Sequence, residues 1–253
     1  MVYIKSKREI ALMKKAGYAV AMAFKNVEDA IKPGMSTLDI DAIVEKTFLD
    51  NGCTSAEKGY YGYPANACVS VNEELVHGIP SSKKILKEGD IVSVDLVANY
   101  QGYMADACRT FVVGKPSDKA EQLVKVTKEA FYKGLEQVKI GNYIGDISNA
   151  IQTYVEAHGY NVTRDYTGHS IGSHMHEDPS IPNYGKAGTG MRIESGMTLC
   201  IEPMVLEGKK DIRVLPDGWT AVSKDKKLTA HYENTVVVYS DKVEIITMYE
   251  GEE

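Results

Sequence analysis

The fold is decided by the stretch Gly89-Asp90-Ile91-Val92-Ser93-Val94-Asp95-Leu96-Val97-Ala98-Asn99-Tyr100-Gln101-Gly102-Tyr103-Met104-Ala105-Asp106, in which two apolar segments flank a polar turn. Apolar segments bounded by such a turn predict a β-hairpin. Each arm carries one aspartate, Asp95 in the first and Asp106 in the second. If Tyr100-Gln101 form a two-residue loop, the resulting register places Asp95 directly opposite Asp106 on one face of the hairpin.

Two carboxylates that face each other need something to compensate their charge. Opposed side chains on a hairpin have Cβ atoms about 4.5–5.5 Å apart, and like charges at that spacing are destabilising. Either one acid keeps its proton at a raised pKa, or a cation lies between the two. The alternative is a three-residue loop with a bulge at Gly102, which would turn the aspartates to opposite faces. Two-residue hairpin loops are the commoner class, so the facing register is favoured.

The composition is that of a soluble globular protein. The 253 residues are 43% hydrophobic and 25% charged, and they are enough for a full core. The net charge is −6 and the lysines occur in small clusters, so specific nucleic-acid binding is not expected. The sequence shows no signal peptide and no apolar run of membrane-spanning length, which favours the cytoplasm. Four cysteines without a C-x-x-C spacing are expected to be buried free thiols.

Two helices are predicted before the hairpin. Apolar residues recur at steps of three and four over residues 6–31, and Pro33-Gly34 ends this pattern. Ser36-Thr37-Leu38-Asp39 resembles a capping box at the start of a second helix, which Gly52 closes. The intervening segments are predicted as a loop over residues 59–64, a short strand over residues 67–71 and a loop over residues 72–80 that carries His77.

The sequence then repeats itself at a distance of 107 positions. After a helix that begins near Ser117, the shift superposes residues at helix ends and caps: Phe24 on Phe131, Lys32 on Lys139, Gly34 on Gly141, Asp39 on Asp146, Ile40 on Ile147 and Gly52 on Gly159. The same shift carries Asp95 onto Glu202, at the end of a strand pattern over residues 198–202. An acid again lies on a strand.

The partner of this second strand is predicted over residues 232–238. Asp217-Gly218, a strong hairpin turn signal, lies between the two strands. With an unbroken register Glu202 would lie opposite Glu233, although bulges near Gly208 and over residues 223–227 could change this pairing.

The halves 1–114 and 115–253 are therefore expected to be copies. Each would have the order helix-helix-strand-hairpin and present two acids, giving an α+β fold around a central, mostly antiparallel sheet. A pseudo-twofold arrangement would bring four carboxylates to one centre. Such a concentration of buried charge requires metal.

Histidines are the other candidate ligands, at positions 77, 158, 169, 174, 176 and 231. His158 is expected at a helix end and His231 at the start of a strand, so neither points to a metal. The segment over residues 167–179 differs, because its glycines bracket a dense set of imidazoles and carboxylates. This segment favours a metal site.

These residues closely resemble type I methionine aminopeptidases, which have the pita-bread fold. The motifs that carry the resemblance are, in order, Val71-Asn72-Glu73, His77-Gly78-Ile79-Pro80, Asp95, Asp106, Gly168-His169-Ser170-Ile171-Gly172, His176-Glu177-Asp178-Pro179, Ile201-Glu202-Pro203-Met204, Asp217-Gly218-Trp219-Thr220 and Glu233. They cover nearly the whole chain. The resemblance implies a single pita-bread catalytic domain over residues 1–253.

The resemblance also implies a centre of two divalent metal ions. Asp95 would chelate one ion, and Asp106 and Glu233 would bridge both. His169 and Glu202 would complete the coordination of the other. Four carboxylates and one imidazole favour Mn²⁺, Fe²⁺ or Co²⁺, with Zn²⁺ and Ni²⁺ as further candidates.

The implied chemistry is hydrolysis by a hydroxide that bridges the two ions and attacks the scissile carbonyl. Glu202 would shuttle the proton, while His77 and His176 would contact the peptide and stabilise the tetrahedral intermediate. The resemblance implies a methionine side-chain pocket formed by Tyr60, Tyr63, Cys68, His77, Met175 and Trp219. Departures from the family pattern stand at Glu57, Ala107-Cys108, Ser170, Met175 and Asn234, and they put the pocket shape and the metal preference in doubt.

The implied function is that of a dinuclear metalloaminopeptidase that removes the initiator methionine from nascent polypeptides whose second residue is small. The expected partners are the peptide and, transiently, the ribosome through loop lysines. Nucleic acid and membrane are not expected, and the chain is expected to be a cytoplasmic monomer.

Three alternatives remain. A proline-directed peptidase of the same fold, such as prolidase, would usually carry an additional N-terminal domain, whereas here the first helix is expected near residue 6. Type II enzymes have a long helical insert between the second histidine and the first glutamate, and the segment from His176 to Glu202 is short. A binding protein of this fold would have lost metal ligands, and all five are present.

Overall fold

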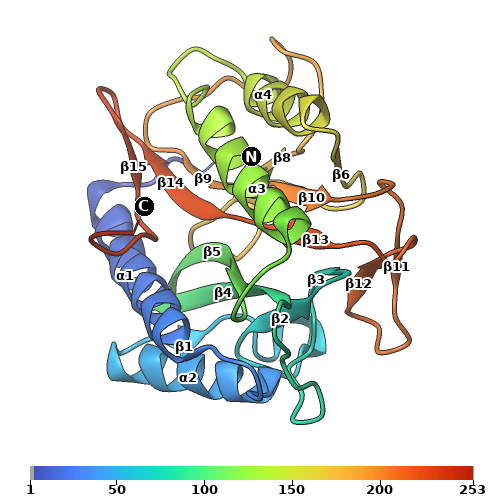
Figure 1. The fold of residues 1–253 in the computed structure, drawn as a ribbon. Coiled ribbons are helices and arrows are strands. Elements are labelled where there is room, and N and C mark those ends of the chain that lie inside the picture. The colour runs from blue at the N-terminus through green and yellow to red at the C-terminus, as the bar shows by residue number, and fades with distance from the viewer. Residues whose placement is uncertain (1–2, 253) are drawn as a thin grey trace.

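The computed structural model describes residues 3–252, which contain four α-helices (Figure 1). They are α1 (Lys7–Ala30), α2 (Thr37–Asp50), α3 (Asp118–Leu135) and α4 (Ile144–Ala157), and a 3-10 helix, η1, covers Tyr60–Gly62. The predicted helix starts are confirmed. The side chains of Ser6 and Ser36 each accept from the N–H three residues on, and Glu9 and Asp39 complete the two capping boxes.

The strands are short except for the central hairpin. The first half contains β1 (Thr54–Ser55), β2 (Cys68–Val71), β3 (Glu74–Val76), β4 (Ile91–Tyr100) and β5 (Tyr103–Val112). The second half contains β6 (Asn161–Val162), β7 (Gly168–Ser170), β8 (Glu177–Ile181), β9 (Thr198–Ile201), β10 (Met204–Leu206), β11 (Ile212–Val214), β12 (Ala221–Ser223), β13 (Thr229–His231), β14 (Asn234–Val238) and β15 (Val243–Ile245). The prediction of a loop over residues 72–80 was wrong, because β3 lies there and pairs with β12 from the far end of the chain.

The hairpin of β4 and β5 is present, but its register differs from the predicted one. The turn is Gln101-Gly102, with φ of 52° and 87°. Positive φ at both positions is what a type I′ turn requires, and a loop one residue earlier would have forced it on a tyrosine. Asp95 therefore pairs with Cys108, and Asp106 pairs with Val97. The two aspartates share a face, as predicted, but they are diagonal neighbours and not directly opposed.

The hairpin of the second half keeps one register from end to end. Strands β9 and β14, β10 and β13, and β11 and β12 all pair antiparallel about Asp217-Gly218, and the two residue numbers of every pair have the same sum. The expected bulges do not change this count. Since Ile201 pairs with Asn234, Glu202 and Glu233 are the next pair in the predicted register, one step beyond the ladder.

The internal repeat is visible in the hydrogen bonding as well as in the sequence. Ser36 forms an isolated bridge with Ile85, and Tyr143 forms one with Arg192. Each residue of the second bridge lies 107 positions after its counterpart in the first. The two halves of the chain therefore share the same local structure at this bridge.

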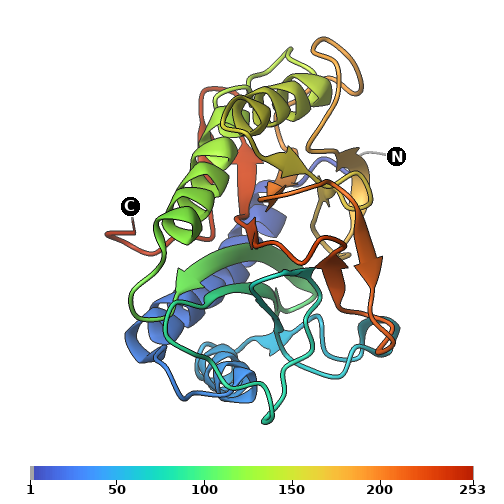
Figure 2. The same ribbon diagram turned by 45° about the vertical axis from the view of Figure 1, so that its right-hand side comes forward.

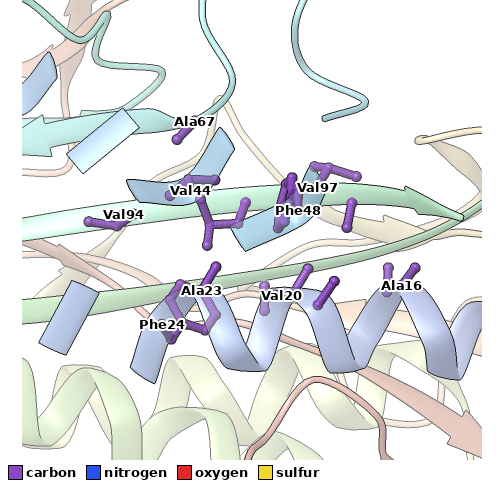
Figure 3. Close-up of a cluster of buried hydrophobic side chains, with 14 of the residues drawn as sticks. Ala16, Val20, Ala23, Phe24, Val44, Phe48, Ala67, Val94 and Val97 are labelled. Atoms are coloured by element: carbon purple, nitrogen blue, oxygen red, sulfur yellow. The ribbon is translucent and has the colours of Figure 1, made fainter. Parts of the chain in front are cut away.

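Helices cover the strands from two sides. Figures 1 and 2 show α1 and α2 beside one part of the sheet structure and α3 and α4 beside the other, with the strands between them. Figure 3 shows Val20 and Phe24 of α1 and Phe48 of α2 gathered around β4 in the larger apolar cluster. A second cluster joins α3 and α4 to β9 and β14. Within residues 3–252, none of the helices has the length and apolar character needed to cross a membrane.

Candidate metal centre

The two halves are joined at the strands that carry the acids. The Thr235 hydroxyl accepts from the Asp106 N–H at 2.9 Å and donates to the Asp106 carbonyl at 2.8 Å. Cys108 and Glu233 exchange two backbone hydrogen bonds of 3.3 and 3.0 Å. These bonds hold β5 against the junction of β13 and β14, so the first-half acids face the second-half acids.

His169 is oriented toward the carboxylates by its own backbone surroundings. It lies in β7, where its Nδ1–H donates to the carbonyl of Ser170 at 3.0 Å. The free Nε2 then lies 3.6 Å from Asp106 Oδ2 and 3.5 Å from Glu202 Oε1. A ring with one nitrogen tied to a carbonyl and the other free is the arrangement that metal-binding histidines adopt.

His231 lies at the same centre. It ends β13, and its Nε2 is 3.9 Å from Glu202 Oε2 and 3.8 Å from Glu233 Oε2. The interpretation of His231 as the first residue of a strand was wrong, and sequence reasoning missed its position. The sequence contained a signal that His231 lies near the acids. His231 precedes Glu233 by two residues, and this spacing puts both side chains on one face of an extended chain.

The carboxylates are buried and under-satisfied. Asp106, Glu202 and Glu233 are each less than 9% exposed. Among the described residues, Asp95 Oδ1, Asp106 Oδ1 and Glu233 Oε1 are buried oxygens without a hydrogen-bond partner. Burial and then the neighbouring acids raise the pKa values of Asp106, Glu202 and Glu233 well above the usual range. Without a cation the centre can only avoid repulsion by holding protons.

The donor set suits divalent cations. Asp106, His169, Cys200 and Glu233 have ligand atoms within 4.8 Å of one another, and so do Glu202, His231 and Glu233. These two groups share Glu233. Oxygen and imidazole donors fit borderline divalent ions such as Mn²⁺, Fe²⁺ and Co²⁺. The orphaned oxygens and the donor types thus both fit metal.

A cleft of about 350 Å³ opens from this centre. The predicted pocket residues all line it, namely Tyr60, Tyr63, Cys68, His77, Met175 and Trp219, together with His176. The metal-ligand residues expected from the sequence form its floor, namely Asp95, Asp106, His169, Glu202 and Glu233. The structure therefore brings together every residue that the sequence analysis selected.

The aromatic wall is held by specific contacts. The Tyr63 hydroxyl donates to the carbonyls of Ala67 and Gly78 at 3.1 and 2.9 Å. Trp219 stacks edge-on against Tyr63, with ring centroids 5.1 Å apart. Asp217 fixes the turn below Trp219 by accepting from its N–H at 2.9 Å. These side chains are positioned before any ligand binds.

Two histidines stand at the mouth of the cleft. His77 has an unusual φ of 60° and packs edge-on against Tyr166, with ring centroids 5.2 Å apart. Burial lowers the pKa of His77 to about 4, so its ring is neutral at pH 7. His176 Nδ1 lies 2.9 Å from the Tyr60 hydroxyl, and its ring is 4.4 Å from the His169 ring. Both rings can offer an N–H to a bound carbonyl.

Glu57 and Tyr166 also line the cleft. The sequence analysis named Glu57 only as a departure from the family pattern, and it did not identify Tyr166. Glu57 is 6% exposed, and its Oε2 has no hydrogen-bond partner among the described residues. Burial and the nearby charge of Asp95 raise the pKa of Glu57 well above its usual range. The pocket therefore favours the protonated form of this carboxyl group.

The other departures from the family pattern have structural roles. Asn234 Oδ1 accepts from Arg109 at 2.7 Å and from the Thr247 hydroxyl at 2.9 Å. The Ser170 hydroxyl donates to the carbonyl of Thr198 at 2.7 Å. Cys108 and Cys200 are buried free thiols, as predicted, and both lie beside the acids.

Comparison with known proteins gives consistent results. A model described as metallopeptidase family M24 matches residues 11–240. The chain is 48% identical to a methionine aminopeptidase of Clostridium acetobutylicum, over 99% of this chain and 100% of that protein. The crystal structure of methionine aminopeptidase from Thermotoga maritima superposes with a TM-score of 0.97 at 48% identity, covering 98% of this chain and 100% of that one. Prolidase from Pyrococcus furiosus superposes with a TM-score of 0.79 at 25% identity, covering 98% of this chain and 66% of that one.

Proposed function

Because the chain belongs to metallopeptidase family M24, we propose that its buried carboxylate centre binds divalent metal ions and removes the N-terminal methionine from peptides. The fold is the pita-bread fold of methionine aminopeptidases, and the chain is a metalloaminopeptidase that acts on peptide substrates. One observation carries the proposal: the buried acids Asp106, Glu202 and Glu233, the half-buried Asp95 and His169 converge from both halves on one cleft. Since both halves supply these groups, we propose one catalytic domain.

The proposed centre holds two ions. Asp95 would chelate one, Asp106 and Glu233 would bridge both, and His169 with Glu202 would bind the other. The presence of Glu233 in two groups of ligand atoms supports its place between the ions, and its grouping with Asp106 and His169 supports a shared ion for those three. Bound there, the pair would polarise the scissile carbonyl and lower the pKa of the water that attacks it. Mn²⁺, Fe²⁺ and Co²⁺ are the proposed metals, with Zn²⁺ and Ni²⁺ as substitutes.

The protein groups handle the proton and the developing charge. Glu202 would take the proton of the attacking water and return it to the amine of the leaving peptide. His77 and His176 would donate N–H groups to the oxygen that becomes negative, one from each side of the cleft. Neutral rings suit this role, since burial lowers the pKa of both imidazoles.

The aromatic wall would select the methionine side chain. Tyr60, Tyr63 and Trp219 enclose a narrow apolar space, and Cys68 and Met175 supply polarisable sulfur beside it. Unbranched thioethers fill such irregular spaces well. The substrates proposed are nascent chains whose second residue is small, because a small residue leaves room beside the cleft.

The proposal is tested by measuring methionine release from Met-Ala-Ser by the full chain loaded with Mn²⁺, Fe²⁺ or Co²⁺. We expect release with metal, none after chelation, and a loss of at least 1000-fold for Glu202→Ala. Asp50→Ala, at an exposed helix end, is the matched acid control. No release with any metal, while a proline dipeptide is hydrolysed, would instead favour a prolidase; absence of both reactions would favour a binding protein.

We further propose that the chain works as a cytoplasmic monomer that meets the ribosome only transiently. Exposed lysines on loops, such as Lys83 and Lys209, support a weak electrostatic contact with RNA. Sedimentation velocity of the metal-loaded protein would test the monomer. Co-sedimentation with ribosomes at low and high salt would test the contact, which should vanish at high salt.

A further inference from the structure

His231 is a buried imidazole with no structural partner. It is 2% exposed, and within the described residues neither Nδ1 nor Nε2 has a hydrogen-bond partner. A neutral imidazole has one N–H donor and one acceptor nitrogen, and burying both without partners is costly. A ring in this position either destabilises the folded protein or is stabilised by a partner from outside the chain.

The surroundings of His231 identify the kind of partner. Its Nε2 lies 3.9 Å from Glu202 Oε2 and 3.8 Å from Glu233 Oε2, both too far for a hydrogen bond. Ligand atoms of one divalent ion each lie about 2.0–2.2 Å from it, so two of them can be at most about 4.4 Å apart. The three atoms therefore surround a space that one cation can fill.

His169 provides an internal comparison. Its Nε2 lies at 3.5 and 3.6 Å from the acids of the same centre, nearly the same separation as for His231. A third group of ligand atoms within 4.8 Å of one another contains Asp95, Cys108 and His231. His231 thus belongs to one group of ligand atoms with Glu202 and Glu233 and to another with Asp95.

We propose that His231 is an additional imidazole ligand of the divalent metal centre, sharing one ion with Glu202 and Glu233. This inference rests on the proposed function only in that the centre holds divalent cations. Two imidazoles among the donors should favour Co²⁺, Fe²⁺ and Zn²⁺ over Mn²⁺ more strongly than one does. His231 is thereby a determinant of metal choice.

The test counts the imidazoles on the metal directly. The chelator-treated full chain is loaded with Co²⁺, and the paramagnetically shifted, exchangeable imidazole N–H resonances are recorded by proton NMR. We expect one such resonance from His169 and a second from His231. His231→Gln should lose the second one, and His158→Gln, an exposed helix-end control, should keep both. Because the wild-type count needs no variant, a folding defect in His231→Gln would leave the test valid.

Calorimetric titration of Co²⁺ and Mn²⁺ supplies the second readout. For His231→Gln we expect at least a tenfold loss of Co²⁺ affinity and a smaller loss for Mn²⁺, with no change for His158→Gln. A single wild-type N–H resonance, or unchanged Co²⁺ affinity in a folded His231→Gln protein, would overturn the proposal. Neither measurement uses peptide hydrolysis, so failure of the proposed aminopeptidase activity would be seen separately.

Discussion

The hydroxyl of Tyr60 lies 2.9 Å from Nδ1 of His176 and joins the first half of the chain to the second across the mouth of the cleft. Burial raises the pKa of the Tyr60 phenol, so it remains protonated and is able to donate this hydrogen bond. Nδ1 of His176 is then the acceptor, and the ring proton is on Nε2. This tautomer presents an N–H donor to a bound peptide carbonyl.

Tyr60→Phe should therefore reduce catalysis without reducing stability. Loss of one orienting hydrogen bond, worth about 1–2 kcal/mol, corresponds to a fall in kcat/KM of about 5- to 30-fold. Steady-state kinetics on Met-Ala-Ser would measure it. Tyr61→Phe is the matched control, because the adjacent Tyr61 is 86% exposed and should tolerate the change. Equal rates for both variants would show that Tyr60 does not orient His176.

Much of the fold follows from local sequence signals because each has a physical cause within a few residues. The capping serines and the glycines after the helices set the helix bounds. The register of the central hairpin could not be predicted from these local signals, because it depends on which two residues adopt positive φ. Gln101-Gly102 adopts positive φ at a lower free-energy cost than a pair that contains a tyrosine. Strand β3 has no local signal, since its partner β12 lies far along the chain.

The candidate site was predictable where carboxylates stand on strands in register. Glu202 and Glu233 were expected opposite each other, and the pairing of β9 with β14 extends to them. His231 was missed because the strand was predicted to begin at Tyr232, whereas His231 ends a separate strand, β13, and the chain changes sheets between β13 and β14. Its direction depends on that change, which is a tertiary feature.

Glu57 offers a prediction about the pocket. Burial and the charge of Asp95 raise the pKa of its carboxyl group well above the usual range, which favours the protonated form. Glu57→Gln has the shape of the protonated acid and should change kcat/KM for Met-Ala-Ser by less than about threefold. Glu57→Ala should enlarge the pocket and raise the relative rate for substrates with a bulkier first residue. A loss of 100-fold in Glu57→Gln would mean that the group is ionised and binds the substrate amine.

Arg109 supports Glu233 from behind. This buried side chain donates to the carbonyl of Glu233 and to Asn234 Oδ1, pairs with Glu252, and lies 4.4 Å over the Tyr232 ring. Arg109→Met would remove the cationic partner of the nearly buried Glu252 carboxylate and one of the two donors to the Glu233 carbonyl, which would keep only the Cys108 N–H.

The expected loss for Arg109→Met is about 3–5 kcal/mol in the free energy of unfolding, which urea denaturation would measure. The exposed Arg8→Met is the control and should change this free energy by less than about 0.5 kcal/mol. Weaker Co²⁺ binding by the folded Arg109→Met protein should accompany the loss, since Glu233 would be held only by its backbone bonds to Cys108. A stability loss below 1 kcal/mol would contradict the assigned role.

The stability of the metal-free protein should fall as the pH rises from 7 to 8. In the folded state the pKa values of Asp106, Glu202 and Glu233 are raised well above the usual range, so these acids keep protons that the unfolded chain has already lost. The folded state binds more protons, and a rise in pH therefore favours unfolding, by about 1.4 kcal/mol per pH unit for each acid still protonated.

This pH range separates the acids from the buried histidines, while the four buried thiols, whose pKa values burial raises, add a smaller fall of the same sign. The buried histidines work in the opposite direction, because burial lowers the pKa of His169 and of His231 to about 3, and unfolding there takes up protons only below about pH 6.5. Above pH 7 both rings are neutral in the folded state and mostly neutral in the unfolded chain, so they contribute little slope, and that slope has the opposite sign. The fall should be measured by urea denaturation in chelator. It should shrink in Glu202→Gln, which lacks one of the acids, and nearly disappear with saturating Mn²⁺, because a bound cation replaces the protons. A metal-free protein equally stable at both pH values would show that the acids are already ionised at pH 7 without any metal.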